Sequence, residues 1–382
     1  MADAGETMTA AAPLGSAAVG ITMPRKDMLF HIGLPKTGST SIQAALVTLG
    51  DGLTTRGICF PYDRIAYAEG YPSTGLPTGA PQTDGLPHFF DVPQRRPGTS
   101  VDWEAAVEDF LSDDTAHMFV FSHENMALLG DRLKRDRMKI LSGRANLHFL
   151  AYLRNPVAYL DSYCLQLVYG HEWIEARAST LQVRRYIQKG FTGMFAPYRA
   201  LGTLHLHDFD ALRGNGGLLA DFFETLGVPE LAERAAALPE LNRRKPRANL
   251  SAVLVALKQV MPRNDARRWF ALTPVLIRAA ADLEPPMAHR FLPAATVESI
   301  EARWREDRRN LAWSNAPSGE HTLQKPPGPD RLSFSREYFD ELYRKVSSDL
   351  PGDLLASLRT VEAMAGHDVE QGLKTAPKVS ME

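Results

Sequence analysis

One lysine lies among small and hydroxyl-bearing residues in the stretch H-I-G-L-P-K-T-G-S-T-S, residues 31–41, which follows an apolar run. Between a strand and a helix, such a loop points backbone N–H groups at an anion. Gly33 and Gly38 keep the glycine spacing of an ATP-binding loop, G-x-x-x-x-G-K-[ST], but Ser39 stands at its lysine position. Lys36 lies inside the loop instead. Three interpretations follow: a degraded ATP site, a simple helix cap after a tight turn, or a loop for another phosphate compound.

A second candidate for anion binding is the arginine in L-R-N-P-V-A-Y-L-D-S-Y. Arg154 follows an apolar run, Asn155 and Pro156 begin a helical pattern, and Ser162 comes eight residues after Arg154. A guanidinium and a hydroxyl group about two helical turns apart can bind one phosphate when the arginine turns back toward the helix. An ATP site also needs a carboxylate to hold Mg²⁺, and we expect no strand to end in such a residue.

Apolar runs that alternate with helical patterns predict an α/β fold, namely a doubly wound parallel sheet with helices on both faces. The predicted strands are residues 28–33, 57–60, 117–122, 147–153 and 203–209. The predicted helices between them are residues 40–49, 103–111, 157–168 and 218–226.

The ends of the chain and one internal segment depart from this alternation. Residues 1–26 read as a disordered tail without the basic start of a signal peptide. Residues 61–100 form a long irregular loop, either a lid or a surface insertion. Residues 231–382 are expected to be a helical region that completes one domain with residues 27–230. Its pattern is helical over residues 248–312, with breaks at Pro262, Pro274 and Pro285, and a last helix is predicted near residues 337–346.

Composition narrows the class of protein. The sequence is 44% hydrophobic and 23% charged, as expected of a globular chain, and its net charge of -2 gives no overall attraction to nucleic acid. Cys59 and Cys164 have no metal-binding or redox spacing. No apolar run is long enough to span a membrane. We therefore expect a cytoplasmic protein without nucleic-acid partners or an integral membrane segment.

Together, the two anion-binding stretches resemble the sulfotransferases that use 3′-phosphoadenosine-5′-phosphosulfate (PAPS). P-K-T-G-S-T at residues 35–40 resembles the 5′-phosphosulfate loop of that superfamily, P-K-[ST]-G-[ST]-[ST], with the lysine in the same position. Arg154 and Ser162 match its 3′-phosphate motif, an arginine followed eight residues later by a serine. Along the rest of the chain the sequence resembles a bacterial branch of soluble, carbohydrate-type sulfotransferases, and the resemblance fades beyond about residue 310. The resemblance implies a P-loop-type fold in which residues 27–230 bind PAPS.

The same resemblance implies roles for the residues of the first loop. Backbone amides and hydroxyls of Thr37, Gly38, Ser39 and Thr40 would hold the 5′-phosphate. Lys36 would lie over the bridging oxygen and the sulfonate. Negative charge grows on that oxygen as the S–O bond breaks, so a cation there stabilises the transition state more than the ground state. No metal is required for this chemistry.

Candidates for the general base follow the strand predicted at residues 117–122. Similar proteins often carry Ser-Ser-Glu where this chain has Ser122, His123 and Glu124, so Glu124 matches the pattern and His123 departs from it. Glu124 is the favoured base, followed by His123, and His88 in the long loop is a weaker candidate. The alternative is that these residues only cap the next helix.

The remaining candidates are a basic run and three histidines. In this superfamily a later basic loop helps to bind the 3′-phosphate, and Arg244 or Lys245 in N-R-R-K-P-R would suit that role, although a solvated basic turn is the alternative. His31 is expected to pack within the first strand. His205 and His207 share one face of a strand but have no further ligand at a metal-binding spacing, so we interpret them as structural.

Three functions therefore remain under comparison. The first is PAPS-dependent sulfuryl transfer to a hydroxyl, with a carbohydrate as the favoured acceptor. The second is an ATP-dependent phosphotransferase with a P-loop, and the missing Gly-Lys-[ST] order argues against it. The third is a non-catalytic nucleotide-binding protein of the same fold, against which Lys36, Arg154 and Ser162 argue.

Overall fold

The structure is a computed structural model that describes residues 25–32, 34, 37–60, 103–123, 132–170, 176–214, 217–238, 246–261, 266–314, 325–329 and 332–368. The tail predicted for the start of the chain lies outside these residues up to residue 24. The long loop predicted for residues 61–100 also lies outside them.

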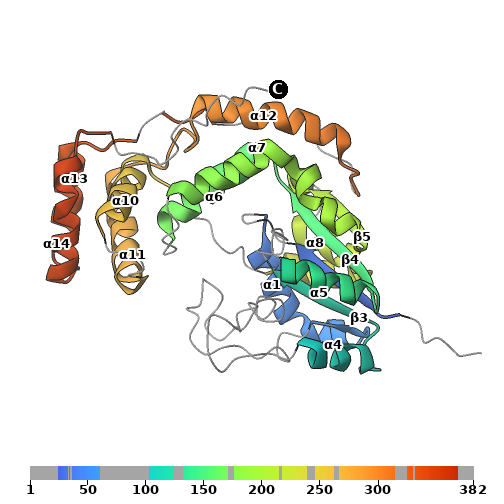
Figure 1. Ribbon diagram of the computed structural model, residues 1–382. Helices are drawn as coiled ribbons and strands as arrows, with labels where there is room; N and C mark the ends of the chain where they lie inside the picture. The colour runs from blue at the N-terminus through green and yellow to red at the C-terminus, as the bar shows by residue number, and fades with distance from the viewer. Residues whose placement is uncertain are drawn as a thin grey trace, which may run out of the picture.

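A five-stranded, all-parallel sheet lies at the centre of the fold, with strand order β2-β3-β1-β4-β5 (Figure 1). All five predicted strands are present, with no end shifted by more than one residue. Their bounds are β1 Asp27–Ile32, β2 Ile58–Cys59, β3 Met118–His123, β4 Asn146–Leu153 and β5 Thr203–Asp208. Nearly continuous apolar runs predicted these strands because a parallel sheet is covered on both faces.

Side chains alternate between the two faces of the sheet, and each face has its own apolar core. On β1, Leu29 packs with one set of helices, whereas Met28 and Phe30 pack with the other. The first face is covered by α1 Ser39–Thr48, α2 Gly50–Thr54, α8 Gly217–Thr225 and α9 Ala232–Ala236. The opposite face is covered by α4 Trp103–Ser112, α5 Arg132–Ser142, α6 Pro156–Tyr169 and α7 Ala176–Arg199. The doubly wound α/β arrangement is therefore confirmed.

The helices that follow the two central strands, β1 and β4, pack on opposite faces of the sheet. The helix after β1, α1, covers one face, and the helix after β4, α6, covers the other. Ligands of doubly wound sheets bind at such a switch point, beyond the carboxyl ends of the strands. The topology thus brings the loop at residues 33–38 and the β4–α6 junction to one edge.

Further helices follow the last strand, as the sequence predicts. They are α10 Ala248–Val260, α11 Ala266–Leu283, α12 Ala294–Asn310, α13 Arg336–Val346 and α14 Gly352–Thr360. Helix α12 runs along α6 and α7, while α10, α11, α13 and α14 form a group next to α6, which α10 contacts (Figure 1). The predicted break at Pro274 is wrong, because Pro274 lies inside α11. Pro274 has no N–H to bond to the carbonyl of Phe270, whose side chain is exposed, while Leu272 and Leu276 on either side of it are buried in the core.

Besides the five-residue α2, the sequence pattern missed two longer helices that cover the sheet, α5 and α7. Helix α5 is mostly charged and buries only a narrow stripe that includes Met138 and Leu141. Helix α7 is interrupted at Gly190, where φ is 58° and ψ is -176°. The buried Asp307 of α12 accepts hydrogen bonds there from the backbone N–H groups of Phe191 (2.6 Å) and Thr192 (3.2 Å). A distant carboxylate thus holds a break that no local pattern indicates.

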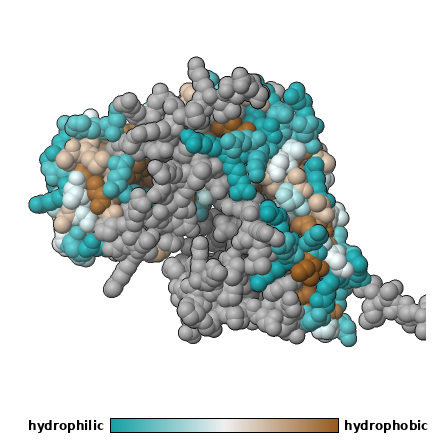
Figure 2. Space-filling view, in the orientation of Figure 1, coloured by the Kyte–Doolittle hydropathy of each residue, from teal (hydrophilic) through white to brown (hydrophobic). Residues whose placement is uncertain are grey.

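The described surface is mainly polar. Among the coloured residues in Figure 2, hydrophilic side chains surround apolar patches that do not join into one surface. Ile140, Val260 and Phe270 are the exposed large apolar residues among the described positions. No helix in the described part of the chain is long and apolar enough to cross a membrane.

Candidate functional site

The loop between β1 and α1 is folded into a tight turn by Thr37. Both its backbone N–H and its hydroxyl Oγ1 donate to the carbonyl of Leu34, at 3.3 Å and 2.7 Å. Thr37 is fully buried. Its hydroxyl therefore shapes the loop, whereas the sequence interpretation assigned it directly to the phosphate.

Gly38 joins this turn to the helix and needs to be glycine. Its φ is 84°, in the left-handed region that side chains rarely adopt. A Cβ atom there would lie 2.1 Å from Cδ2 of Leu218 and 3.7 Å from Cε2 of Phe209. The second glycine of the loop is thus explained by backbone conformation and close packing, independently of any ligand.

Helix α1 begins at the predicted place, immediately after Gly38. Ser39 is its first residue and is 1% exposed, and the backbone of Thr40 is helical. The predicted cap by a side chain is not formed, because the cap position is occupied by Gly38 and no side chain bonds there. The first N–H groups of a helix have no acceptor within the helix, so they form an anion-binding end.

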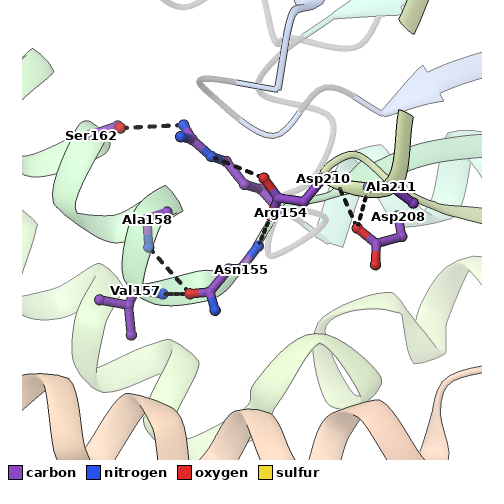
Figure 3. A network of polar contacts seen from close by, with 8 residues as sticks. All are labelled: Arg154, Asn155, Val157, Ala158, Ser162, Asp208, Asp210 and Ala211. Atoms are coloured by element: carbon purple, nitrogen blue, oxygen red, sulfur yellow. Dashed lines mark hydrogen bonds and ion pairs between the residues drawn. The ribbon is translucent and has the colours of Figure 1, made fainter. Parts of the chain in front are cut away.

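Arg154 and Ser162 meet as the spacing predicts. Nη1 of Arg154 lies 3.5 Å from Oγ of Ser162 (Figure 3). Between them Asn155 caps α6, because its Oδ1 accepts from the N–H groups of Val157 (2.9 Å) and Ala158 (3.4 Å). This cap and Pro156 at the first helical position turn the chain sharply, so the arginine side chain folds back along the helix.

Sequence reasoning missed two carboxylates at this junction. Asp210 accepts a hydrogen bond from the backbone N–H of Asn155 (2.9 Å), and its Oδ1 lies 3.9 Å from Nε of Arg154. Strand β5 ends in an acidic residue, Asp208, which the sequence interpretation did not consider when it expected no strand to end in a carboxylate for Mg²⁺. Asp208 Oδ1 accepts from the N–H groups of Asp210 (2.9 Å) and Ala211 (3.3 Å), which fixes the turn (Figure 3). The D-F-D spacing after the strand was the available signal.

Phe209 lies between the two predicted anion-binding motifs. Its ring centroid is 5.9 Å from Cζ of Arg154. Cε2 of the ring would lie 3.7 Å from a Cβ atom built at Gly38. The backbone N–H of Phe209 donates to the carbonyl of Leu153 at the end of β4 (2.9 Å). One aromatic side chain, directly after β5, thus lies between the loop after β1 and the junction after β4.

Several predicted site residues lie outside the described residues. These are Lys36, Glu124, Arg244, Lys245 and His88. The backbone of His123 forms the last position of β3, and the side chains of His123 and Thr40 are also outside the description. Their assigned roles stay predictions from the sequence.

Arg247, the last residue of the basic run, contacts the helix that carries Ser162. The backbone N–H of Arg247 donates to the hydroxyl of Tyr169, the last residue of α6, at 3.0 Å. Seven residues separate Tyr169 from Ser162, or about 10 Å along a helix. Arg247 is therefore held at the C-terminal end of the helix that carries Ser162.

His31 is packed in its strand, as expected, and joins β1 to β3. Its Nδ1 lies 2.8 Å from Oγ of the neighbouring Ser122, and both residues are buried. The side chain of Gln43, on α1, donates to the carbonyl of Ser122 (3.1 Å). Nε2 of His31 is buried without a hydrogen-bond partner among the described residues. Burial lowers the pKa of His31 from 6.5 to about 3, so the imidazole is neutral at physiological pH.

Acidification is expected to destabilise the folded chain through His31. Between pH 6.5 and about 3 the unfolded state binds a proton that the folded state does not, so stability falls with pH. The loss reaches at most ~1.4 kcal/mol per pH unit, and above pH 6.5 the effect vanishes. Urea unfolding of the wild type and His31→Asn across this range measures it, since asparagine keeps a polar atom for Ser122 but does not titrate. Equal pH dependence in the two proteins would contradict the assignment.

The other strand histidines are consistent with structural roles. Nδ1 of His207 lies 2.7 Å from the carboxylate of Asp221, which also accepts from the hydroxyl of Tyr152 at 2.8 Å. His205 stacks beside His148, with ring centroids 5.8 Å apart. Burial, aided by the neighbouring His148 and His207, lowers the pKa of His205. In the part of the chain that the structure describes, no group of three His, Cys, Asp or Glu residues could hold a metal ion.

The chain matches no protein-family model, no curated protein and no solved structure. Inference about its function therefore depends on the residues and geometry of the site described above.

Proposed function

We propose that the chain is a sulfotransferase that moves the sulfuryl group of PAPS to a hydroxyl, with a carbohydrate as the favoured acceptor. The observation that carries the proposal is the approach of Arg154 Nη1 to Ser162 Oγ, 3.5 Å, at the sheet edge that also carries the phosphate loop. The two motifs come from distant parts of the sequence and have Phe209 between them. A nucleotide with phosphate groups at both its 5′ and 3′ positions could bind one phosphate at the loop after β1 and the other at Arg154 and Ser162.

The proposed binding mode gives each motif one end of the donor. The N-terminal N–H groups of α1 and the Ser39 hydroxyl hold the 5′-phosphate, while Arg154 and Ser162 hold the 3′-phosphate. The helix dipole of α1 adds to the attraction for the anion. Because Thr37 is bonded to Leu34, its part is to hold the loop in shape rather than to contact the phosphate.

The chemical step is an in-line displacement at sulfur. The acceptor oxygen forms a new S–O bond, and the S–O bond to the 5′-phosphate breaks with its electron pair left on that phosphate. Glu124 takes the acceptor proton, with His123 as the alternative base. Lys36 stabilises the negative charge that develops on the leaving oxygen. The products are a sulfate ester and adenosine 3′,5′-bisphosphate (PAP).

Calorimetric titration separates this function from an ATP-dependent phosphotransferase. We expect PAP to bind without a divalent cation and to bind at least about tenfold more tightly than ATP or Mg²⁺-ATP, because only PAP engages Arg154 through a 3′-phosphate. Tight binding of Mg²⁺-ATP together with no binding of PAP would overturn the proposal and favour the phosphotransferase.

Transfer from labelled PAPS to a panel of acceptors separates an enzyme from a non-catalytic nucleotide-binding protein. We expect label in carbohydrate hydroxyls, with release of one PAP per sulfate ester formed. PAP binding without transfer to any acceptor class, and without slow hydrolysis of PAPS, would favour the non-catalytic alternative.

A further inference from the structure

The carboxylate of Asp210 contacts both parts of the β4–α6 junction. One of its oxygens accepts the backbone N–H of Asn155 (2.9 Å), and the other lies 3.9 Å from Nε of Arg154. The Asp210 side chain is 9% exposed and the Arg154 side chain is 20% exposed, so solvent screens this pair only in part. The Asp210 carboxylate therefore contacts both the backbone next to Arg154 and the Nε edge of the Arg154 guanidinium.

The segment that carries Asp210 is itself fixed. Asp208 accepts the backbone N–H of Asp210 at 2.9 Å, and the N–H of Phe209 donates to the carbonyl of Leu153 at 2.9 Å. Arg154 thus has a carboxylate at its Nε edge and Ser162 at its Nη1 end (Figure 3). The Phe209 ring lies at one side of the guanidinium, 5.9 Å from its centre.

We propose that Asp210 is a positioning residue that aims Arg154 and thereby makes the site selective for nucleotides with a 3′-phosphate over those with a free 3′-hydroxyl. This inference rests on the proposed function. A guanidinium offers its N–H donors in a rigid fork, and a carboxylate on the Nε edge leaves the Nη end directed toward Ser162. Without Asp210, the Arg154 side chain would no longer be held with its Nη end toward Ser162, and the site would bind a 3′-phosphate less tightly.

A simple charge argument predicts the opposite effect, so the two explanations can be separated. Asp210 is negative and repels a phosphate bound nearby, so its neutralisation should strengthen PAP binding if only charge mattered. If Asp210 aims Arg154, neutralisation should weaken PAP binding. In Asp210→Asn the amide oxygen can still accept the N–H of Asn155, but the amide nitrogen then faces the guanidinium and no longer attracts it.

The experiment compares PAP with 5′-AMP, which differs only in lacking the 3′-phosphate. We expect Asp210→Asn to weaken PAP binding about tenfold and to change 5′-AMP binding by less than about twofold. In an Arg154→Ala background, Asp210→Asn should change PAP binding by less than about twofold, because the group through which it acts is gone. Asp210→Glu keeps the charge but moves it by one methylene, and we expect it to weaken PAP binding too. Thermal unfolding of each variant establishes that it is folded.

Equal or tighter PAP binding by Asp210→Asn would overturn the inference, as would an equal loss with and without Arg154. Wild-type PAP binding by Asp210→Glu would also count against it and would serve as the decisive measurement if Asp210→Asn did not fold. Failure of the proposed function gives a different result, because the wild type itself would then bind PAP no better than 5′-AMP.

Discussion

Replacing Lys36 by alanine is expected to lower kcat by about a hundredfold to a thousandfold while PAP affinity changes by less than about threefold. The reason is the place of the lysine in the loop, two residues before Gly38 and three before Ser39. An ATP loop places its lysine beside the γ-phosphate, whereas here the ammonium is assigned to the bridging oxygen of a phosphosulfate. Charge on that oxygen is small in the bound donor and large in the transition state, so the lysine acts mainly on turnover.

Steady-state turnover with PAPS and calorimetry with PAP together measure this split. Lys36→Arg, which keeps the charge but changes its shape, should retain more activity than Lys36→Ala. If Lys36→Ala instead raised the Kd for PAP as much as it lowered kcat, the lysine would serve ground-state binding, and its assignment to the leaving oxygen would be wrong.

Arg154→Ala is expected to weaken PAP binding about a hundredfold, or ~2.7 kcal/mol, with little effect on 5′-AMP. The guanidinium approaches Ser162 at 3.5 Å on a capped helix and is ordered beside Phe209 and Asp210, so little conformational entropy is lost when it binds a phosphate. At saturating PAPS we expect kcat to fall much less than the affinity, because the 3′-phosphate is remote from the sulfur.

Arg144→Ala is a matched control for the loss of one arginine. Arg144 pairs with Glu108 and lies just before β4 begins, at the opposite end of that strand from Arg154. The Arg144→Ala variant should bind PAP with the affinity of the wild type. A similar loss of PAP affinity in Arg144→Ala would show that overall charge, rather than the Arg154–Ser162 pair, determines binding.

The strands were predictable because each buried strand carries its own signal. The run before Gly33 and the run before Arg154 are almost entirely apolar, and both form central strands buried on two faces. The start of α6 at Asn155 and Pro156 was equally predictable, since a capping residue and a proline at the first helical position are local features of the sequence. Helices α5 and α7 were missed because α5 buries a narrow stripe and α7 is interrupted at Gly190.

The candidate site shows the same division. The spacing predicted that the side chains of Arg154 and Ser162 come together, because eight residues across a capped helix start is a local distance. Asp210, in contrast, lies 55 residues after Asn155, and nothing near Arg154 in the sequence indicates that contact. Thr37 was assigned to a ligand, whereas its hydroxyl folds the loop onto Leu34.

By itself, the sequence determined the five strands, the helix starts around the two motifs and the residue types suited to phosphate groups. Those features follow from local burial, capping and side-chain chemistry. Only the tertiary structure decided that the loop after β1 and the junction after β4 meet at one sheet edge, with Phe209 between them and Asp210 behind Arg154. Strand order and sheet register bring these residues together from distant segments, and no local pattern encodes that meeting.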